Sequence, residues 1–219
     1  MAKSDYSPAL IEFVTVAVPF CAALERAGEL RRDDFLDRLL HLAPLLYLKA
    51  LMLNDEAESP DPEDTPPEVV TEAAYEELKD SLSELLAEKD DFLEAQSDNM
   101  RYSTEPLHAT ISECLADVYQ PVANLVAVVR EENTLALPAA VALCCALFAE
   151  YWGDRLLAVA RALHRALFYT ETDTFDEPDP HNHKVDLLRH HHTGLPTDEL
   201  GECTHESCEG ESHCHCHDL

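Results

Sequence analysis

Apolar residues recur every three to four positions along most of the chain, the spacing that places them on one face of an α-helix. No segment shows the alternation of apolar and polar residues that is typical of a half-buried strand. The predicted helices cover residues 8–27, 33–53, 72–88, 104–131 and 137–168. We therefore expect an all-α fold, an antiparallel helical bundle of about five main helices.

Residues with special backbone or capping properties mark several of these helices. Ser7 followed by Pro8 is a typical helix start, because the hydroxyl accepts a bond from a free backbone N–H and proline needs no donor in the first turn. Thr71 is the predicted N-cap of the third helix. Pro44 and Pro121 lie inside the second and fourth helices, where we expect bends.

The run of apolar residues 135–149 predicts a buried segment in the last helix. This run is apolar nearly all round, so we expect the last helix to be central and covered by the others. It is shorter than the roughly 20 residues needed to cross a bilayer. The N-terminus carries Asp5 and Glu12 and lacks the basic head of a signal peptide. We expect a cytoplasmic protein without a membrane partner.

Two segments lack the apolar residues needed for a core. Residues 54–69 are rich in proline and carboxylates, which predicts a loop whose composition is also compatible with disorder. From about Thr170 onward, Asp, Glu, Pro, His and Cys replace Leu and Ala. The predicted organisation is a helical bundle domain over residues 1–169 and a disordered acidic tail over residues 170–219.

The formal net charge is −29, from 15 Lys and Arg against 44 Asp and Glu, so negatively charged partners are disfavoured. Nucleic acids and anionic membranes require clustered basic side chains, so we expect neither as a partner. Mimicry of nucleic acid by an acidic surface stays open, although such charge more often serves solubility.

The tail concentrates the side chains that transition metals prefer. Nine of the 12 histidines and four of the eight cysteines lie in residues 170–219, and the chain ends in strict alternation of the two. The predicted metal ligands are His190, His191, His192, Cys203, His205, Cys208, His213, Cys214, His215, Cys216 and His217. Their spacing differs from the paired C-x2-C motifs of structural zinc modules, so we expect adaptable binding of Zn, Ni or Cu ions.

A solvated acidic tail in which His and Cys are incidental is the alternative. The remaining cysteines occupy apolar helical positions and are predicted to be buried thiols: Cys21, Cys114, Cys144 and Cys145.

One carboxylate pair offers a second hypothesis. Glu113 and Asp117 are four residues apart and therefore share a helix face. With Tyr119 and Lys49 they are candidates for a metal-assisted or acid-base enzyme cleft, although such carboxylates more often face water. No residue is assigned a catalytic role and no organic cofactor is expected. The first hypothesis is a non-enzymatic module that binds a protein or small-molecule partner and carries a metal-chelating tail.

Several separate motifs, in order over residues 8–168, carry a family resemblance. They are "LLYLKALML", "VVTEAAYEELKDSL", "DDFLEA", "ISECLADVYQPV" and "EYWGDRLLAVARALH". Together they resemble the bacterial family catalogued as domain of unknown function 5063. The resemblance implies an all-helical cytoplasmic domain and brings no catalytic residues. The His/Cys tail departs from the family pattern, so a metal function would belong to this chain alone.

Overall fold

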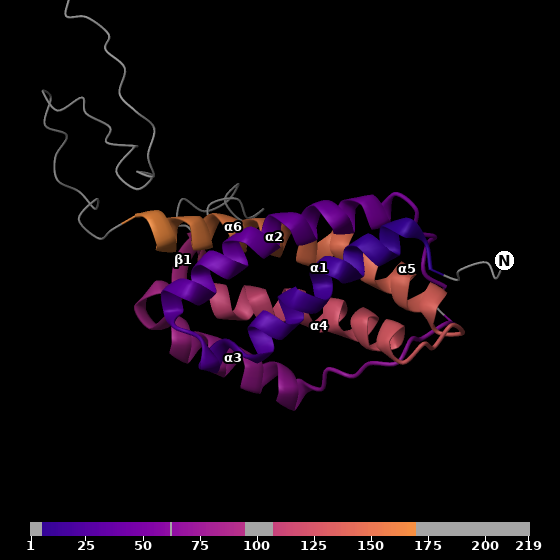
Figure 1. Ribbon diagram of the computed structural model, residues 1–219, viewed down its shortest axis with the longest axis horizontal. Helices are drawn as coiled ribbons and strands as arrows, with labels where there is room; N and C mark the ends of the chain where they lie inside the picture. Colours follow the sequence, from indigo (N-terminus) through magenta and orange to yellow (C-terminus); the bar gives the residue numbers. More distant parts are fainter. Residues whose placement is uncertain (1–5, 62, 95–106, 170–219) are drawn as a thin grey trace, which may run out of the picture. The chain divides into compact units, whose positions relative to one another are not determined.

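The computed structural model describes residues 6–61, 63–94 and 107–169 (Figure 1). Its α-helices are α1 (Pro8–Glu25), α2 (Arg32–Asn54), α3 (Glu72–Leu86), α4 (Ile111–Arg130), α5 (Leu137–Leu147) and α6 (Gly153–Phe168). Short helical turns are η1 (Ala27–Glu29), η2 (Ala87–Lys89) and the π-turn η4 (Phe148–Trp152), and the strands are β1 (Asp91–Glu94) and β2 (Leu107–Thr110). The all-α prediction is confirmed.

Side-chain caps fix the starts of three helices. The Ser7 hydroxyl accepts a hydrogen bond from the Leu10 N–H at 3.2 Å, and Thr71 accepts one from the Ala74 N–H at 3.2 Å. Both predicted caps are confirmed. The predicted start of the fourth helix, near residue 104, is wrong, because α4 begins at Ile111 with Thr110 as its N-cap.

The missed feature before α4 is a small hairpin. β1 and β2 pair antiparallel, from Asp91 opposite Thr110 to Glu94 opposite Leu107. Buried Asp90 joins this hairpin to α4, because its carboxylate accepts bonds from the Ser112 N–H at 2.8 Å and the Ser112 hydroxyl at 2.7 Å. Strands of four residues are too short for periodicity to reveal, so these residues were assigned to a connector and a helix.

The predicted helix over residues 137–168 is divided by the π-turn η4. Here the Trp152 indole N–H donates to the Cys144 carbonyl at 3.0 Å, and Trp152 is only 1% exposed. A Cβ on Gly153 would lie 2.6 Å from the Phe148 carbonyl oxygen and 2.9 Å from the Phe148 ring. The turn therefore requires glycine at this position.

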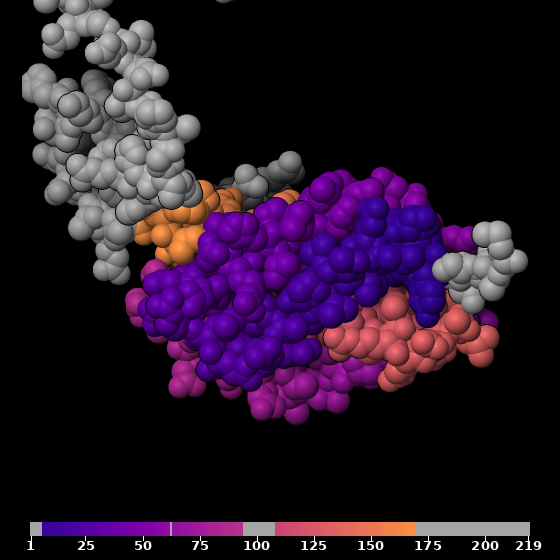
Figure 2. Space-filling model, viewed as in Figure 1, coloured from indigo at the N-terminus to yellow at the C-terminus, as the bar shows by residue number. Residues whose placement is uncertain are grey.

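The centre of the bundle is α4 and not the last helix. Eleven residues of α4 are buried, and it packs against α1, α3, α5 and α6. Five of the 11 residues of α5 are buried, because α5 packs mainly against α4 and its extension η4. Figure 2 shows the side chains of α1 and α2 covering one face of the bundle. The prediction of a fully covered last helix is thus wrong for α5.

The acidic loop between α2 and α3 contains no helix or strand among its described residues. Its last part is nevertheless packed, since Pro66 and Val70 are buried. The Asn124 side-chain oxygen on α4 accepts hydrogen bonds from the N–H groups of Val69 (2.9 Å) and Val70 (3.0 Å). The end of the predicted loop is therefore held against the bundle.

Helix α1 is the one described helix that is long and apolar enough to cross a bilayer by length and composition alone. The core helix of a soluble protein passes the same test. Phe13, Ala17 and Phe20 have no exposed surface, and α1 packs against α2 and α4. Helix α1 thus packs one face into the core of the bundle. Cys21, Cys114, Cys144 and Cys145 are buried free thiols, as predicted.

Candidate functional site

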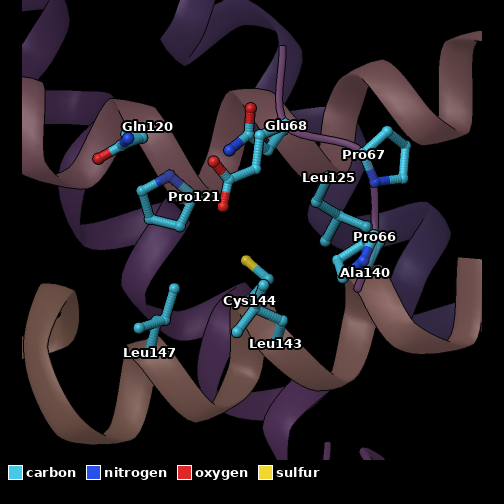
Figure 3. A pocket seen from close by; sticks show the side chains of 11 residues that line it. Pro66, Pro67, Glu68, Gln120, Pro121, Leu125, Ala140, Leu143, Cys144 and Leu147 are labelled. Atoms are coloured by element: carbon cyan, nitrogen blue, oxygen red, sulfur yellow. The ribbon is translucent and has the colours of Figure 1, made fainter. Parts of the chain in front are cut away.

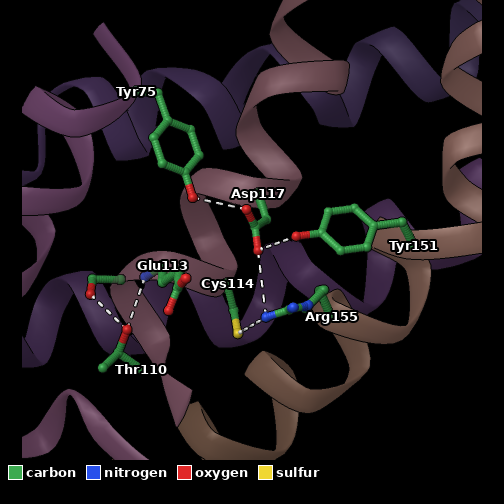
Figure 4. A network of polar contacts seen from close by, with 8 residues as sticks. Tyr75, Thr110, Glu113, Cys114, Asp117, Tyr151 and Arg155 are labelled. Atoms are coloured by element: carbon green, nitrogen blue, oxygen red, sulfur yellow. Dashed lines mark hydrogen bonds and ion pairs between the residues drawn. The ribbon is translucent and has the colours of Figure 1, made fainter. Parts of the chain in front are cut away.

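A half-buried carboxylate joins three elements of the bundle. The Asp117 side chain on α4 is 12% exposed, and its two oxygens accept hydrogen bonds from the hydroxyls of Tyr75 on α3 and Tyr151 on η4, both at 2.8 Å (Figure 4). The Arg155 guanidinium on α6 lies 3.5 Å from Asp117 Oδ2. Asp117 is therefore surrounded by donors from α3, η4 and α6.

Besides Asp117, Arg155 contacts two further side chains, those of Cys114 and Tyr151. Its Nη1 lies 3.6 Å from the Cys114 sulfur, and its guanidinium carbon lies 5.1 Å from the centre of the Tyr151 ring. We call Tyr75, Cys114, Asp117, Tyr151 and Arg155 the Asp117 cluster. Cys114 and Asp117 are three residues apart on α4, and Tyr151 and Arg155 are four apart across the η4–α6 junction, so each pair shares one helix face.

The ionisation of the cluster argues against an activated nucleophile or base. Burial, followed by the hydrogen bond to Asp117, raises the pKa of Tyr151 to about 12. The same causes raise the pKa of Tyr75. Burial also raises the pKa of the Cys114 thiol, although Arg155 opposes that shift. At neutral pH the phenols stay protonated and donate to Asp117, and the thiol stays protonated too.

The structure does not bring the predicted enzyme residues together. Glu113 is exposed, one turn from Asp117. The Tyr119 hydroxyl donates to Glu25 Oε1 on α1 at 2.9 Å, and Lys49 Nζ lies 2.7 Å from Glu12 Oε2 (Glu12 is also on α1). Tyr119 and Lys49 thus each bind a carboxylate of α1 and neither binds Asp117, so the four do not line one cleft.

The partners of Asp117 were missed by sequence reasoning. Tyr75 and Tyr151 lie 42 and 34 residues away from Asp117 along the chain, so no local spacing connects them. The spacing of Tyr151 and Arg155 places this pair on one helix face, but it does not identify the acid that the pair contacts.

A cavity of about 160 Å³ lies between the end of the acidic loop, α4 and α5 (Figure 3). Its floor is apolar and buried, whereas its rim reaches solvent. The lining residues are Pro66, Pro67, Glu68, Gln120, Pro121, Asn124, Leu125, Ala140, Leu143, Cys144 and Leu147. The cavity is small for a cofactor and suits a ligand of about one ring.

Metal-ligating side chains do not gather in the part of the chain that the structure describes. No group of three or more His, Cys, Asp or Glu residues there could hold an ion. The predicted ligands, from His190 to His217, lie outside the described residues. Binding of Zn, Ni or Cu by the tail stays a prediction.

Comparison with known proteins identifies a family and similar solved structures. The model of a family described as "Domain of unknown function (DUF5063)" matches residues 4–169. The crystal structure of protein BF1032 from Bacteroides fragilis is similar, with a TM-score of 0.64 and 36% sequence identity over 75% of this chain and 96% of that chain. No curated protein matches this chain.

Proposed function

We infer that this chain, which belongs to the DUF5063 family, is a non-enzymatic binding protein whose C-terminal tail chelates transition-metal ions. The observation that carries the proposal is the concentration of nine histidines and four cysteines in residues 170–219. The family match ends at residue 169, so the proposed chelating role rests on the tail of this chain and not on the family.

The chemistry of the tail fits soft and borderline metals. Neutral imidazole and thiolate are the protein ligands that Zn, Ni and Cu(I) bind in preference to water. The alternation from His213 to His217 offers five ligands within a short stretch of chain. A site of this kind is assembled by the metal itself, because binding supplies the free energy that orders the chain. Neighbouring carboxylates, such as Glu211 and Asp218, raise the local concentration of cations.

The bundle supports the non-enzymatic half of the proposal. Both Asp117 oxygens accept hydrogen bonds from phenols whose pKa is raised, and Arg155 lies 3.5 Å from Oδ2, so this carboxylate already serves as an acceptor in a contact network within the bundle. Lys49 and Tyr119, the other members of the predicted cleft, are paired with α1 carboxylates. The bundle therefore acts as a stable body that carries the tail and binds a small partner.

The experiment is a titration of the full chain with Zn²⁺, Ni²⁺ and Cu⁺ against a competing chelator. The test variant replaces Cys214 and Cys216 with Ser, and His213, His215 and His217 with Asn. The matched control replaces three exposed bundle histidines with Asn: His41, His108 and His164.

We expect micromolar or tighter binding by the full chain, about a tenfold or larger loss in the tail variant, and no change in the control. Millimolar affinity in the full chain would contradict the proposal, as would equal losses in the two variants.

A further inference from the structure

The cavity between the acidic loop, α4 and α5 combines a dry floor with an open mouth. Leu125, Ala140 and Cys144 form the floor, and each is 5% exposed or less. Leu143 and Leu147 are half-buried at the side, which leaves a path from solvent. An apolar floor of this kind favours the burial of a hydrocarbon group.

A single carboxylate faces this apolar floor. Glu68 is exposed, and Figure 3 shows its side chain reaching toward the space between Pro121 and Leu125. Among the described residues, no hydrogen bond or ion pair joins the Glu68 carboxylate to another group. No Lys, Arg or His lines the cavity, so Glu68 is the charged group that a ligand meets there.

The position of Glu68 is fixed by its neighbours. The Asn124 side-chain oxygen binds the backbone N–H groups of Val69 and Val70, directly after Glu68. Buried Pro66 holds the chain on the other side. The chain is therefore held on both sides of Glu68, by Asn124 of α4 after it and by the burial of Pro66 before it.

We propose that this cavity binds a small hydrophobic amine, in which a protonated amino group pairs with Glu68 and one aromatic ring or branched alkyl group fills the floor. The volume of about 160 Å³ is close to that of an apolar cavity that accepts benzene. The net charge of −29 further favours a cation over an anion of the same shape. The proposal does not depend on the tail.

The probe is benzylamine, with benzyl alcohol and benzoate as the neutral and anionic ligands of similar size. Affinities are measured by NMR titration of the full chain, with the methyl signals of Leu125, Leu143 and Leu147 as reporters of the cavity. We expect benzylamine to bind about threefold to tenfold more tightly than benzyl alcohol and benzoate to bind most weakly. Salt should reduce the preference for the amine.

Glu68→Gln is the test variant, and it keeps the fold because Glu68 is exposed. Its matched control is Glu58→Gln, which removes the same charge from a separate hollow of about 530 Å³ between α1, α2 and α5. We expect Glu68→Gln to abolish the preference for the amine and Glu58→Gln to preserve it. Equal binding of amine and alcohol, loss of the preference in Glu58→Gln alone, or unshifted methyl signals would overturn the proposal.

Discussion

At the residue scale, Asp117 shows how a bundle can satisfy a mostly buried carboxylate with donors from three elements. Three donors approach it from α3, η4 and α6, and burying a charge is tolerated only with partners of this kind. Asp117 is a polar centre of the bundle, and a functional role for it stays a hypothesis. The predicted companions are wrong, since Lys49 and Tyr119 bind elsewhere.

The Asp117 cluster should contribute to stability through coupled contacts. We expect Tyr75→Phe and Tyr151→Phe each to lower the free energy of unfolding by about 1.5–3 kcal/mol, because each removes one hydrogen bond to a charged group. In an Asp117→Asn background, each loss should be smaller. Chemical denaturation of the single and double variants measures this coupling, and strictly additive effects would show that the contacts are independent.

Gly153 should be intolerant of a side chain. Gly153→Ala would place a methyl group 2.6 Å from the Phe148 carbonyl oxygen, so we expect a loss of about 1–3 kcal/mol from overpacking. Gly28→Ala is the matched control, because nothing lies within 4 Å of the added methyl. Its effect on thermal unfolding should be within about 0.5 kcal/mol of zero. Equal effects of the two substitutions would remove the steric explanation of the π-turn.

At the scale of elements, caps could be predicted and short or interrupted elements could not. Ser7 and Thr71 cap helices as expected, since a cap is a local interaction that the sequence displays directly. The hairpin depends on a contact between residues distant in sequence, Asp90 with Ser112. The π-turn interrupts a helix whose apolar pattern continues, so periodicity does not reveal it. Apolar composition also overstated the burial of α5, because composition does not say which neighbours will cover a helix.

Asn124 should hold the end of the acidic loop against α4. Asn124→Ala removes the acceptor of two backbone N–H groups, so the amides of Val69 and Val70 should exchange with solvent at least about tenfold faster. Asn124→Asp keeps an acceptor oxygen and should retain most of the protection. Hydrogen exchange followed by NMR measures both variants. Unchanged protection in Asn124→Ala would mean that packing of Pro66 and Val70 alone orders the loop.

At the scale of the whole molecule, the raised pKa values of phenols and thiols predict sensitivity to alkaline pH. The pKa of Tyr151 rises from 10.0 to about 12 on folding, and that of Cys21 from 9.0 to about 12, mainly through burial. Once the pH exceeds the pKa values of these groups in the unfolded chain, the unfolded chain binds fewer protons than the folded chain. The free energy of unfolding therefore falls as pH rises.

The contribution of these groups is complete below pH 9 and is lost by about pH 12. Denaturant titrations across this range should show the fall, and Tyr151→Phe should reduce the part above pH 10 while leaving the onset near pH 9. A free energy of unfolding that stays constant across this range would contradict the assigned burial of these groups.

The central claim is that a self-sufficient helical bundle carries a metal-chelating tail, and elemental analysis tests it most directly. The full chain and residues 1–169 are both purified without an affinity tag, and the molar ratio of Zn, Ni and Cu to protein is measured. The account predicts a stoichiometric amount of metal in the full chain and none in residues 1–169. Equal metal content in the two proteins, or none in either, would contradict it.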